Sequence, residues 1–463
     1  MKTVAEMPIL NREICQKARL SRDPRFDGKF FTAVKTTKIY CRSICPATTP
    51  KEENVLYFSM AIEAANAGYR PCLRCRPDSA PGSPAWKGVN ATLERAIRLI
   101  GEGVLQNNSL PFLADRLGVS DRYLRQLFKK HLGVSPKKYA LHQQCLFAKK
   151  LLHQTKLPIT KIALASGFNS IRRFNDCFQS QLSLTPSKVR KSGEIKPNAL
   201  LQLQLYYRPP YDWPSMYNFL MRRAIPRLEW CDEQRYGRIF EWSGSVGSFM
   251  VQHVEGKNRF DVTIELDNME NLKPVVNNIR RVLDLDVDIQ AVEQDLQQHF
   301  AAVTLLKTGL RLPGTWNIFE AGIRAIVGQQ ISVVAARNLV TCLVSELGVK
   351  VEDKRLFPSP QAIASSDLGF LKMPESRKQT LRNLAQHYMN SDAPTDPQKW
   401  LELKGIGPWT VDYARLRGLS DPDIYLGGDL GVKKAVGKLS NNINPELASP
   451  WRSYLTMQLW SQL

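Results

Sequence analysis

Four cysteines near the N-terminus have the spacing of a metal site. Cys41 and Cys45 are separated by three residues and Cys72 and Cys75 by two, with 26 residues between the pairs. Each short turn can direct two sulfurs at one ion, so the pattern predicts a tetrahedral Zn2+ site. Thiols of a cytosolic chain stay reduced, which favours a metal over disulfides. Such a zinc site either holds a small domain together or activates a thiolate for nucleophilic attack.

A second stretch that could do chemistry lies near the other end of the chain, in Leu401–Tyr413. There we expect a helix that ends at Gly405, a tight turn through Gly407, and a second helix that begins at Pro408. Proline suits the first helical position. This helix-hairpin-helix would direct backbone N–H groups and a helix N-terminus at a DNA phosphate. The carboxylate of Asp429 follows 22 residues after Gly407.

The middle of the chain contains an internal repeat. Each copy predicts a short helix that ends at a glycine, followed by a longer helix with an apolar stripe, which is the pattern of a helix-turn-helix. The first longer helix begins at Ser120 or Asp121, since either can cap it. The predicted helices span 110–118 and 121–132 in the first copy, and 159–167 and 170–182 in the second.

The chain is long enough for about three domains. It has 463 residues, of which 43% are hydrophobic. Linker-like compositions at 78–84 and near 191–197 separate a small N-terminal segment, a helical middle segment and a long C-terminal segment. The last segment begins with strand-like runs and reads as helices from about residue 275. The strand-like runs are 201–207, 238–243, 248–254 and 259–266.

The charge of the chain is strongly basic and unevenly distributed. The net charge is +21; residues 90–196 carry 19 Lys and Arg against 6 Asp and Glu, whereas residues 197–463 carry 30 against 29. A positive charge this concentrated favours nucleic acid as partner. No apolar run approaches the roughly 20 residues of a membrane helix, and the N-terminus shows no signal-peptide pattern. We therefore expect a cytoplasmic protein without a membrane partner.

The residues around the four cysteines resemble a known family. The stretches Phe26–Phe31, Ile39–Pro46, Glu53–Val55 and Arg70–Pro77 closely resemble the N-terminal domain of the Ada family. The resemblance implies that Cys41 accepts a methyl group from a DNA methylphosphotriester, while the other three cysteines remain zinc ligands.

The charge of such a site makes this chemistry coherent. Four thiolates on Zn2+ leave two net negative charges, which repel an ordinary phosphodiester but not a neutral methylated triester. Methylation of Cys41 removes one of these charges, so that repair could raise DNA affinity. Arg42, Arg70 and Arg76 are candidate phosphate contacts; the alternative is that they are ordinary surface arginines.

The repeat, which closes with Leu184–Ser187, resembles the DNA-binding domain of the AraC family over about residues 90–190. The resemblance implies that the two longer helices enter successive major grooves of double-stranded DNA. The alternative is a helical module that binds proteins. The candidate DNA contacts are Arg122, Arg125, Arg172 and Arg173.

The C-terminal segment resembles the AlkA-type 3-methyladenine DNA glycosylases. The resemblance rests on Leu401–Tyr413, Phe319–Ser332 and Pro450–Tyr454, and extends less specifically to the strand-rich residues 200–290. It implies that Asp429 is the catalytic carboxylate, which stabilises positive charge on the deoxyribose or activates water. The alternative is that Asp429 only caps the helix after it. The resemblance also implies an aromatic pocket for a flipped base made by Trp409, Tyr413 and Trp451, against the alternative of core packing.

Three residues depart from the pattern of the AlkA-type family. Trp409 stands where bifunctional relatives carry a catalytic lysine, so no β-lyase activity is expected. Gln330 stands where the family has an apolar wedge that fills the gap left by a flipped base, and Gln330 or Ile331 is expected to serve instead. Leu430 replaces an aromatic residue after Asp429, which could alter base preference.

The sequence thus predicts a mainly α multidomain protein with α+β parts. We expect it to bind Zn2+, accept methyl groups, regulate transcription, with RNA polymerase as a possible partner, and excise alkylated bases such as 3-methyladenine. One alternative is a regulator whose glycosylase-like half is inactive, and another is an enzyme that the zinc domain only targets. No Pro-Cys-His alkyl-acceptor motif follows the repeat, so repair of O6-methylguanine is not expected. The expected domains are 1–80 (zinc), 88–193 (helix-turn-helix), 198–290 (β-rich) and 291–463 (helix-hairpin-helix).

Overall fold

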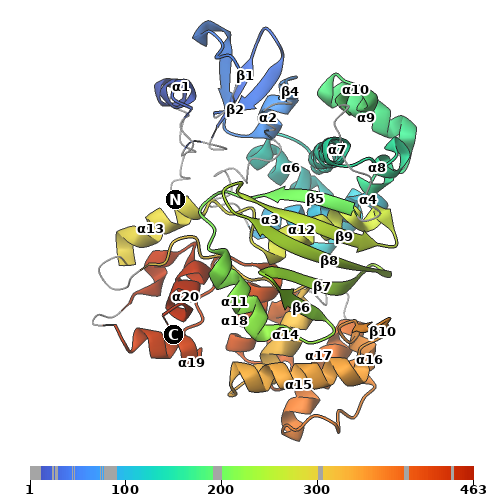
Figure 1. Cartoon of the computed structure of the whole chain (residues 1–463), viewed down its shortest axis with the longest axis vertical. Helices are drawn as coiled ribbons and strands as arrows, with labels where there is room; N and C mark the ends of the chain where they lie inside the picture. The colour runs from blue at the N-terminus through green and yellow to red at the C-terminus, as the bar shows by residue number, and fades with distance from the viewer. Residues whose placement is uncertain are drawn as a thin grey trace. The chain divides into compact units, whose positions relative to one another are not determined.

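The structure is a computed structural model of the 463-residue chain, shown in Figure 1. It forms two compact units: unit 1 is Met1–Ala199 with Met269–Asn277, and unit 2 is Leu200–Asn268 with Asn278–Leu463. The residues that the structure describes are 12–22, 26, 30–43, 45, 47–72, 75, 77, 91–190, 201–300, 306–390, 396–439 and 443–462.

The cysteine-bearing part of unit 1 is built on a small four-stranded sheet. In the strand order β3-β1-β2-β4, strand β4 runs parallel to β2 and the other neighbours are antiparallel. Cys41 lies in β2 and Cys72 directly follows β4, and the Cys72 N–H donates to the Tyr40 carbonyl at 2.9 Å. The parallel pairing therefore brings the two cysteine pairs together. The elements are α1 Arg12–Leu20, β1 Phe31–Val34, β2 Ile39–Arg42, η2 Glu52–Asn54, β3 Val55–Phe58, α2 Ala61–Asn66 and β4 Arg70–Pro71.

The repeat forms two helix-turn-helix units. Ser120 Oγ accepts from the Tyr123 N–H and Ser170 Oγ from the Arg173 N–H, each at 3.2 Å. Of the two N-cap candidates that the sequence offered, Ser120 and Asp121, the structure shows Ser120 in this role. The turns contain Gly118, with a φ of +68°, and Gly167, with a φ of +84°; glycine adopts this left-handed backbone without strain. The helices are α3 Ala91–Gly101, α4 Val104–Asn107, α5 Leu110–Arg116, α6 Asp121–Leu132, α7 Pro136–Gln154, α8 Ile159–Ala165, α9 Ile171–Leu182 and α10 Pro186–Val189.

The two copies bury matching positions at an offset of 50 residues. Along α6 and α9 the burial pattern is the same, residue for residue, over the first ten positions. In each copy an apolar stripe faces the core, and the solvent-facing side of the helix stays polar. The buried residues are Leu124, Leu127, Phe128 and Leu132 in α6, and Phe174, Cys177, Phe178 and Leu182 in α9.

Unit 2 begins with a five-stranded antiparallel sheet in the order β5-β9-β8-β7-β6. The four strand-like runs of the sequence are confirmed. Strand β6 was not predicted, because its four residues, Glu-Trp-Cys-Asp, include two charges and lack apolar alternation. Helix α11 Trp213–Arg223 packs against β7. The strands are β5 Leu201–Tyr206, β6 Glu229–Asp232, β7 Arg235–Trp242, β8 Ser245–Val254 and β9 Arg259–Leu266.

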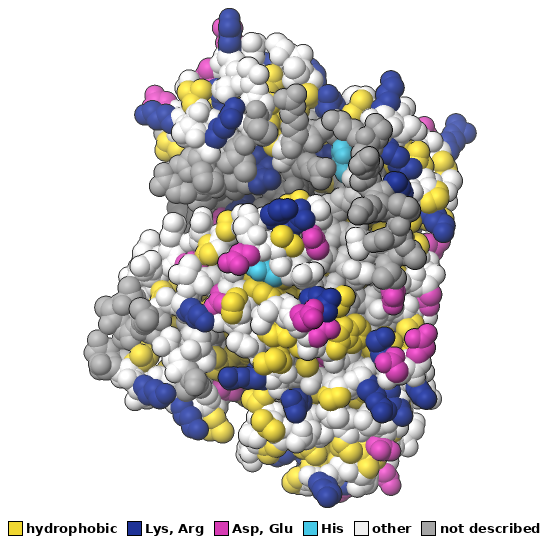
Figure 2. Space-filling view, viewed as in Figure 1, with side chains coloured by type: hydrophobic (Ala, Val, Ile, Leu, Met, Phe, Trp, Pro, Cys, Tyr) yellow, Lys and Arg dark blue, Asp and Glu magenta, His cyan; other side chains and the backbone are white. Residues whose placement is uncertain are grey.

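The rest of unit 2 is mainly helical, as expected, with a short antiparallel strand pair at 350–351 and 354–355. On the face in Figure 2, Lys and Arg side chains of this unit are interspersed with Asp and Glu, in keeping with the balanced charge of residues 197–463. None of the described helices has the length and apolar character to cross a membrane. The helix η5 Met269–Asn271 and α12 Leu272–Val282 as far as Asn277 belong to unit 1. The remaining elements, all of unit 2, are α13 Ile289–Phe300, α14 Ile318–Gly328, α15 Val333–Leu347, β10 Lys350–Val351, β11 Lys354–Arg355, α16 Pro360–Ala364, α17 Glu375–Asn390, η6 Pro397–Glu402, α18 Pro408–Leu419, α19 Leu430–Val436, η7 Pro445–Ala448 and α20 Arg452–Trp460.

A buried ion cluster joins the sheet to α14. Arg238 of β7 binds Glu320 of α14, with Nη2 and Oε2 2.9 Å apart. Arg324 binds Glu229 of β6 at 2.7 Å and Glu320 at 2.8 Å. The Tyr236 hydroxyl donates to Glu229 at 2.8 Å. Charges this deeply buried are tolerated because each is paired and hydrogen-bonded.

Candidate functional site

The four cysteine sulfurs form a cluster of the size that zinc requires. All lie within 4.8 Å of one another, and the Cys45 and Cys72 sulfurs are 4.0 Å apart. Tetrahedral zinc with bonds of ~2.3 Å places its sulfurs about 3.8 Å apart. The four soft sulfur ligands at this spacing therefore fit Zn2+, as predicted from the sequence.

The four thiols are not equivalent. Cys72 and Cys75 are buried, whereas Cys41 and Cys45 are partly exposed. The Arg42 backbone N–H donates to Cys75 Sγ at 3.3 Å, which further reduces the nucleophilicity of that sulfur. Burial and solvent access thus leave Cys41 and Cys45 as the sulfurs that a DNA lesion can reach.

The structure gives the predicted arginines near the cluster different surroundings. The Arg42 side chain is half-buried and donates from Nη1 to the Cys75 carbonyl at 3.3 Å, so it braces the second cysteine pair. Arg70 is also half-buried, and its backbone N–H donates to the Lys38 carbonyl at 2.8 Å. Arg76 lies outside the described residues.

The four predicted arginines of the helix-turn-helix units all have exposed side chains. Arg122 and Arg172 occupy matching positions as the second residues of α6 and α9, whereas Arg125 and Arg173 have no arginine at the matching position of the other copy. Arg125 lies 3.6 Å from the Asp121 carboxylate, with both side chains about half exposed, a contact too weak to hold it away from a ligand. The arginines are therefore available to phosphate or base edges.

The predicted hairpin is present, but its first helix is wrong in type and end. Residues Pro397–Glu402 form the 3-10 helix η6, which continues through two further i→i+3 turns to Ile406. Gly405 has a φ of +92°, and a Cβ there would collide with Thr380 Oγ1. Gly407 caps α18, whose N-terminus begins with Pro408 as predicted. Nothing lies within 4 Å of a Cβ at Gly407, so this side of the turn is open to a ligand.

A loop between α14 and α15 is tied to the hairpin. Gln329 Nε2 donates to the Gly405 carbonyl at 3.3 Å and to Thr410 Oγ1 at 3.0 Å. The next residue, Gln330, is exposed and has a φ of +58°, while Ile331 is half-buried. A non-glycine residue in this region is uncommon and is often found at functional sites. Of the two wedge candidates, Gln330 is the one that projects from the loop.

Asp429 is the N-cap of α19, as one interpretation of the sequence held. Its Oδ1 accepts from the N–H groups of Gly431 and Val432 at 2.8 and 3.2 Å. The same oxygen accepts from Trp460 Nε1 at 3.0 Å. Three donors on one oxygen fix the carboxylate in one orientation, which a catalytic group also needs.

Two of the three predicted pocket aromatics lie together beside Asp429. The Trp409 and Tyr413 rings, one turn apart on α18, have centroids 5.4 Å apart. A Cβ on Gly428, which precedes Asp429, would be 3.8 Å from Trp409 Cδ1. Trp409 Nε1 is buried with no hydrogen-bond partner among the described residues. A buried indole donor without a partner suits a site that takes a polar, aromatic ligand.

The third predicted aromatic, Trp451, has different surroundings. It precedes α20 and packs edge-on against Tyr454, with centroids 6.2 Å apart. Both residues belong to the apolar cluster against which Trp409 and Tyr413 also pack. Its role in the base pocket stays a prediction.

Sequence reasoning missed four residues that continue the wall from Asp429 to Tyr413. Trp460 stacks on Phe219 of α11, with centroids 6.2 Å apart and planes at 27°. The guanidiniums of Arg223 and Arg417 lie 3.7 and 4.7 Å from the Phe219 centroid. Arg417 Nη1 donates to the Tyr413 hydroxyl at 3.0 Å. Burial acts to raise the pKa of Tyr413, but these guanidiniums lower it below its usual value.

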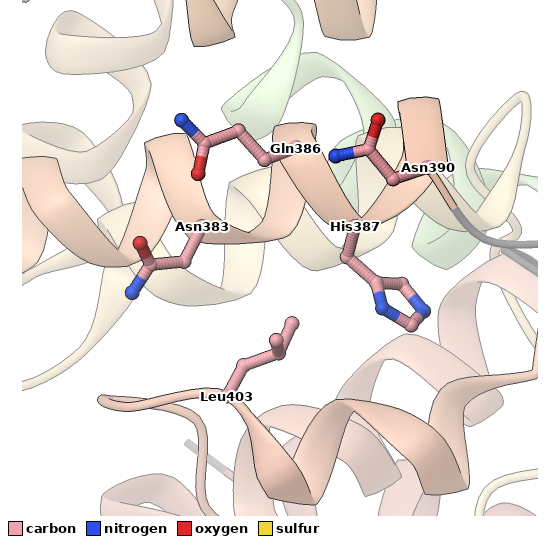
Figure 3. Close-up of a pocket in the computed structure, with 5 residues that line it drawn as sticks. All are labelled: Asn383, Gln386, His387, Asn390 and Leu403. Atoms are coloured by element: carbon pink, nitrogen blue, oxygen red, sulfur yellow. The ribbon is translucent and has the colours of Figure 1, made fainter.

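A separate hollow of about 340 Å³ lies along α17, as Figure 3 shows. Asn383, Gln386, His387 and Asn390 of α17 line it together with Leu403, which lies between η6 and the hairpin turn. The His387 ring extends from α17 toward the segment that carries Leu403. None of these residues belongs to the wall around Asp429.

Three family models match consecutive parts of the chain. The metal-binding domain of Ada matches residues 14–78, a helix-turn-helix domain matches 113–192, and the AlkA N-terminal domain matches 202–317. The chain is therefore a fusion of an Ada-type zinc domain and a helix-turn-helix domain with an AlkA-type glycosylase fold.

A relative with the same organisation covers nearly the whole chain. The "Probable bifunctional transcriptional activator/DNA repair enzyme AlkA" of Mycobacterium tuberculosis is 33% identical over 97% of this chain and 96% of its own length. "DNA-3-methyladenine glycosylase 2" of Escherichia coli is 32% identical over 55% of this chain and 95% of its own. "Bifunctional transcriptional activator/DNA repair enzyme Ada" of Escherichia coli is 33% identical over 38% of this chain and 48% of its own. The chain belongs to the family of bifunctional transcriptional activator and DNA repair enzymes represented by the mycobacterial protein.

Proposed function

We propose that the chain repairs alkylated DNA at two separate sites. The observation that carries the proposal is Asp429, whose carboxylate is fixed by three donors beside Trp409, Tyr413 and Trp460. The arrangement suits hydrolysis of an N-glycosidic bond in a flipped nucleotide. The aromatic faces receive an electron-poor alkylated base, such as 3-methyladenine, and the carboxylate stabilises the positive charge that develops on the deoxyribose.

The hairpin and the Gln330 loop position the DNA for this reaction. The open Gly407 turn and the N-terminus of α18 direct N–H groups at a phosphate. Gln330 enters the space that the flipped nucleotide leaves. Trp409 offers no amine, so no Schiff base forms there and the strand is not cut by β-elimination. Release of the free base and an abasic site is the whole reaction.

At the cysteine cluster, the proposed reaction is methyl transfer from a phosphotriester to Cys41. The Cys41 sulfur attacks the methyl carbon; an S–C bond forms, the C–O bond breaks, and the phosphodiester leaves as an anion. Bound Zn2+ would keep the sulfur as a thiolate. No group restores the thioether, so each molecule reacts once. Arg42, Arg70 and Arg76 are the proposed phosphate contacts.

The loss of one negative charge on methylation couples this site to the helix-turn-helix units. We propose that it strengthens binding to promoter DNA, with Arg122, Arg125, Arg172 and Arg173 on phosphates or bases. Activation of transcription by contact with RNA polymerase, in the cytoplasm, is part of the same proposal.

One incubation with methylated DNA tests both reactions, because they leave different products. Free 3-methyladenine in solution reports the glycosylase, and methyl groups retained on the protein report the acceptor. We expect Asp429→Asn to lose base release and keep methyl acceptance, since asparagine can still cap α19. We expect Cys41→Ala to show the reverse.

The outcomes also separate the alternatives. Unchanged base release by Asp429→Asn would remove the catalytic assignment, and no base release by the wild type would favour a regulator with an inactive half. Methyl transfer that persists in Cys41→Ala would point to Cys45, the other accessible sulfur. Failure of pre-methylated protein to activate a reporter would favour an enzyme that the zinc domain only targets.

A further inference from the structure

A pair of thiols lies inside the second helix-turn-helix unit, far along the chain from the zinc cluster. Cys177 of α9 stands where the first copy has Leu127 of α6, and both are buried. Cys145 is fully buried in α7, which packs against α9. The Cys145 and Cys177 side chains are hydrogen-bonded to each other. At this position the first copy has an unreactive leucine in its core, whereas the second copy has a cysteine that is paired with another thiol.

A cavity of about 470 Å³ reaches Cys177, one member of this pair. Its wall includes Cys177, Arg173 and Ser180 of α9, together with Gln106 and Gly167. The Gln106 Nε2 atom is buried and has no hydrogen-bond partner among the described residues. The cavity therefore offers a hydrogen-bond donor and a thiol to a small polar molecule.

The surroundings of Cys177 favour the reactive form of the thiol. Hydrogen bonding from Cys145 lowers the pKa of Cys177; burial opposes this, and the Arg173 guanidinium adds to the lowering. The thiolate is the form that attacks peroxides and disulfides.

We propose that Cys145 and Cys177 are a peroxide-sensitive dithiol that controls DNA binding by α9. Cys177 attacks a hydroperoxide that enters the cavity; an S–O bond forms, the O–O bond breaks, and water or an alcohol leaves with the proton. Cys145 then attacks the sulfenic sulfur; an S–S bond forms, the S–O bond breaks and water leaves. The hydroperoxide is reduced and the two thiols are oxidised.

The disulfide changes the position of the DNA-binding helix. A disulfide bond is about 2.05 Å long, well below the separation of two hydrogen-bonded sulfurs. Its formation draws α9 toward α7 and moves the exposed Arg172 and Arg173 with it. This step rests on the proposed DNA binding by α9, whereas the chemistry of the pair does not.

The experiment oxidises the zinc-loaded full chain with hydrogen peroxide, blocks remaining thiols and maps the tryptic peptides. Peptide 139–149 carries Cys145 and peptide 174–188 carries Cys177. We expect these two peptides to be joined after oxidation, to separate on reduction, and to stay apart in Cys177→Leu, which restores the residue of the first copy. Cys342→Ser, which removes a partly exposed thiol of unit 2, is the matched control and should still form the cross-link.

The affinity for a random-sequence duplex at low salt gives the functional measurement. We expect a drop of at least about threefold on oxidation, reversed by reduction and absent from Cys177→Leu. The same drop in Cys177→Leu would assign the effect to the zinc cysteines and would overturn the switch. A cross-link without any change of affinity would also overturn the switch. Recovery of both peptides unlinked would overturn the dithiol itself. A reduced chain that binds no DNA would instead contradict the proposed function.

Discussion

At the scale of single residues, Asp429 has an observed structural role as the N-cap of α19 and is the carboxylate that we propose for catalysis. Its Oδ1 caps α19 and accepts from Trp460, so the orientation of the carboxylate is set by backbone and by a second aromatic residue. If only the helix N–H groups or only the Trp460 N–H bound the carboxylate, the Asp429 side chain could still rotate. The cap is therefore compatible with the proposed catalytic role, because it holds the carboxylate in one orientation.

Trp460 is expected to act as a positioning residue through Asp429. Trp460→Phe keeps the stacking on Phe219 but removes the N–H donor. We expect kcat for 3-methyladenine release to fall by about ten- to a hundredfold, since a hydrogen bond to a charged group contributes roughly 1.5–3 kcal/mol. The pH dependence of kcat should also shift, because Asp429 loses a hydrogen-bond donor. If Trp460 had only a structural role, its loss would leave the pH dependence unchanged. Phe219→Leu, which removes the stacking and keeps the donor, is the comparison; an unaltered pH profile in Trp460→Phe would contradict the role.

At the scale of elements, the two recognition helices make a prediction about salt. Arg172→Ala with Arg173→Ala removes two exposed cations from α9 without touching its buried stripe. If both bind phosphates, the slope of log affinity against log salt should decrease by about two, measured by fluorescence anisotropy on a duplex. Arg235→Ala removes a charge from the sheet of unit 2 and should leave the slope unchanged. An equal loss of affinity at every salt concentration would argue against phosphate contacts.

The small sheet of unit 1 makes a prediction about the metal. Among the described residues its central apolar cluster is small, with Phe31, Ala33, Tyr40, Ala64 and Tyr69 buried, and a core of this size holds a domain poorly without help. Removal of zinc by a chelator should unfold this sheet and abolish methyl acceptance. Release of 3-methyladenine should persist, measured on the same sample. Retained methyl acceptance by metal-free protein would contradict the assignment.

The elements also show what the sequence could and could not predict. Cysteine spacing, the 50-residue repeat and the Gly-Ile-Gly turn each depend on local sequence, and the structure confirms all three. The wall around Asp429 was only partly predicted, because Phe219 and Arg417 reach it by tertiary packing alone. The tail motif drew attention to Trp451, which precedes α20, whereas the donor to Asp429 is Trp460 at the other end of that helix.

At the scale of the whole molecule, acid stability tests the buried ion cluster. Burial acts to raise the pKa of Glu229, but the guanidiniums of Arg324 and Arg238 lower it to about 2. An unfolded glutamate has a pKa of about 4.3. Because the folded value is lower, the carboxylate contributes on the order of 3 kcal/mol above pH 4.3, and this is lost as the pH falls toward 2.

We expect the difference in unfolding free energy between wild type and Glu229→Gln to shrink as the pH falls from 6 to 3. Urea unfolding followed by tryptophan fluorescence measures it, since eight of the nine tryptophans belong to unit 2. Asp232→Asn, on the exposed end of the same strand, should show no such trend. A difference that stays constant with pH would contradict the low pKa of Glu229.

The ion cluster also limits how this half of the chain can be divided. A fragment that starts at residue 291, where the helical domain was expected to begin, would lose Arg238 and Glu229 and leave Glu320 and Arg324 facing only each other in an apolar interior. Helix α14 would lose its anchorage, and with it the Gln330 loop at its end. The strands therefore help to hold α14, and with it the loop that carries Gln330, in place.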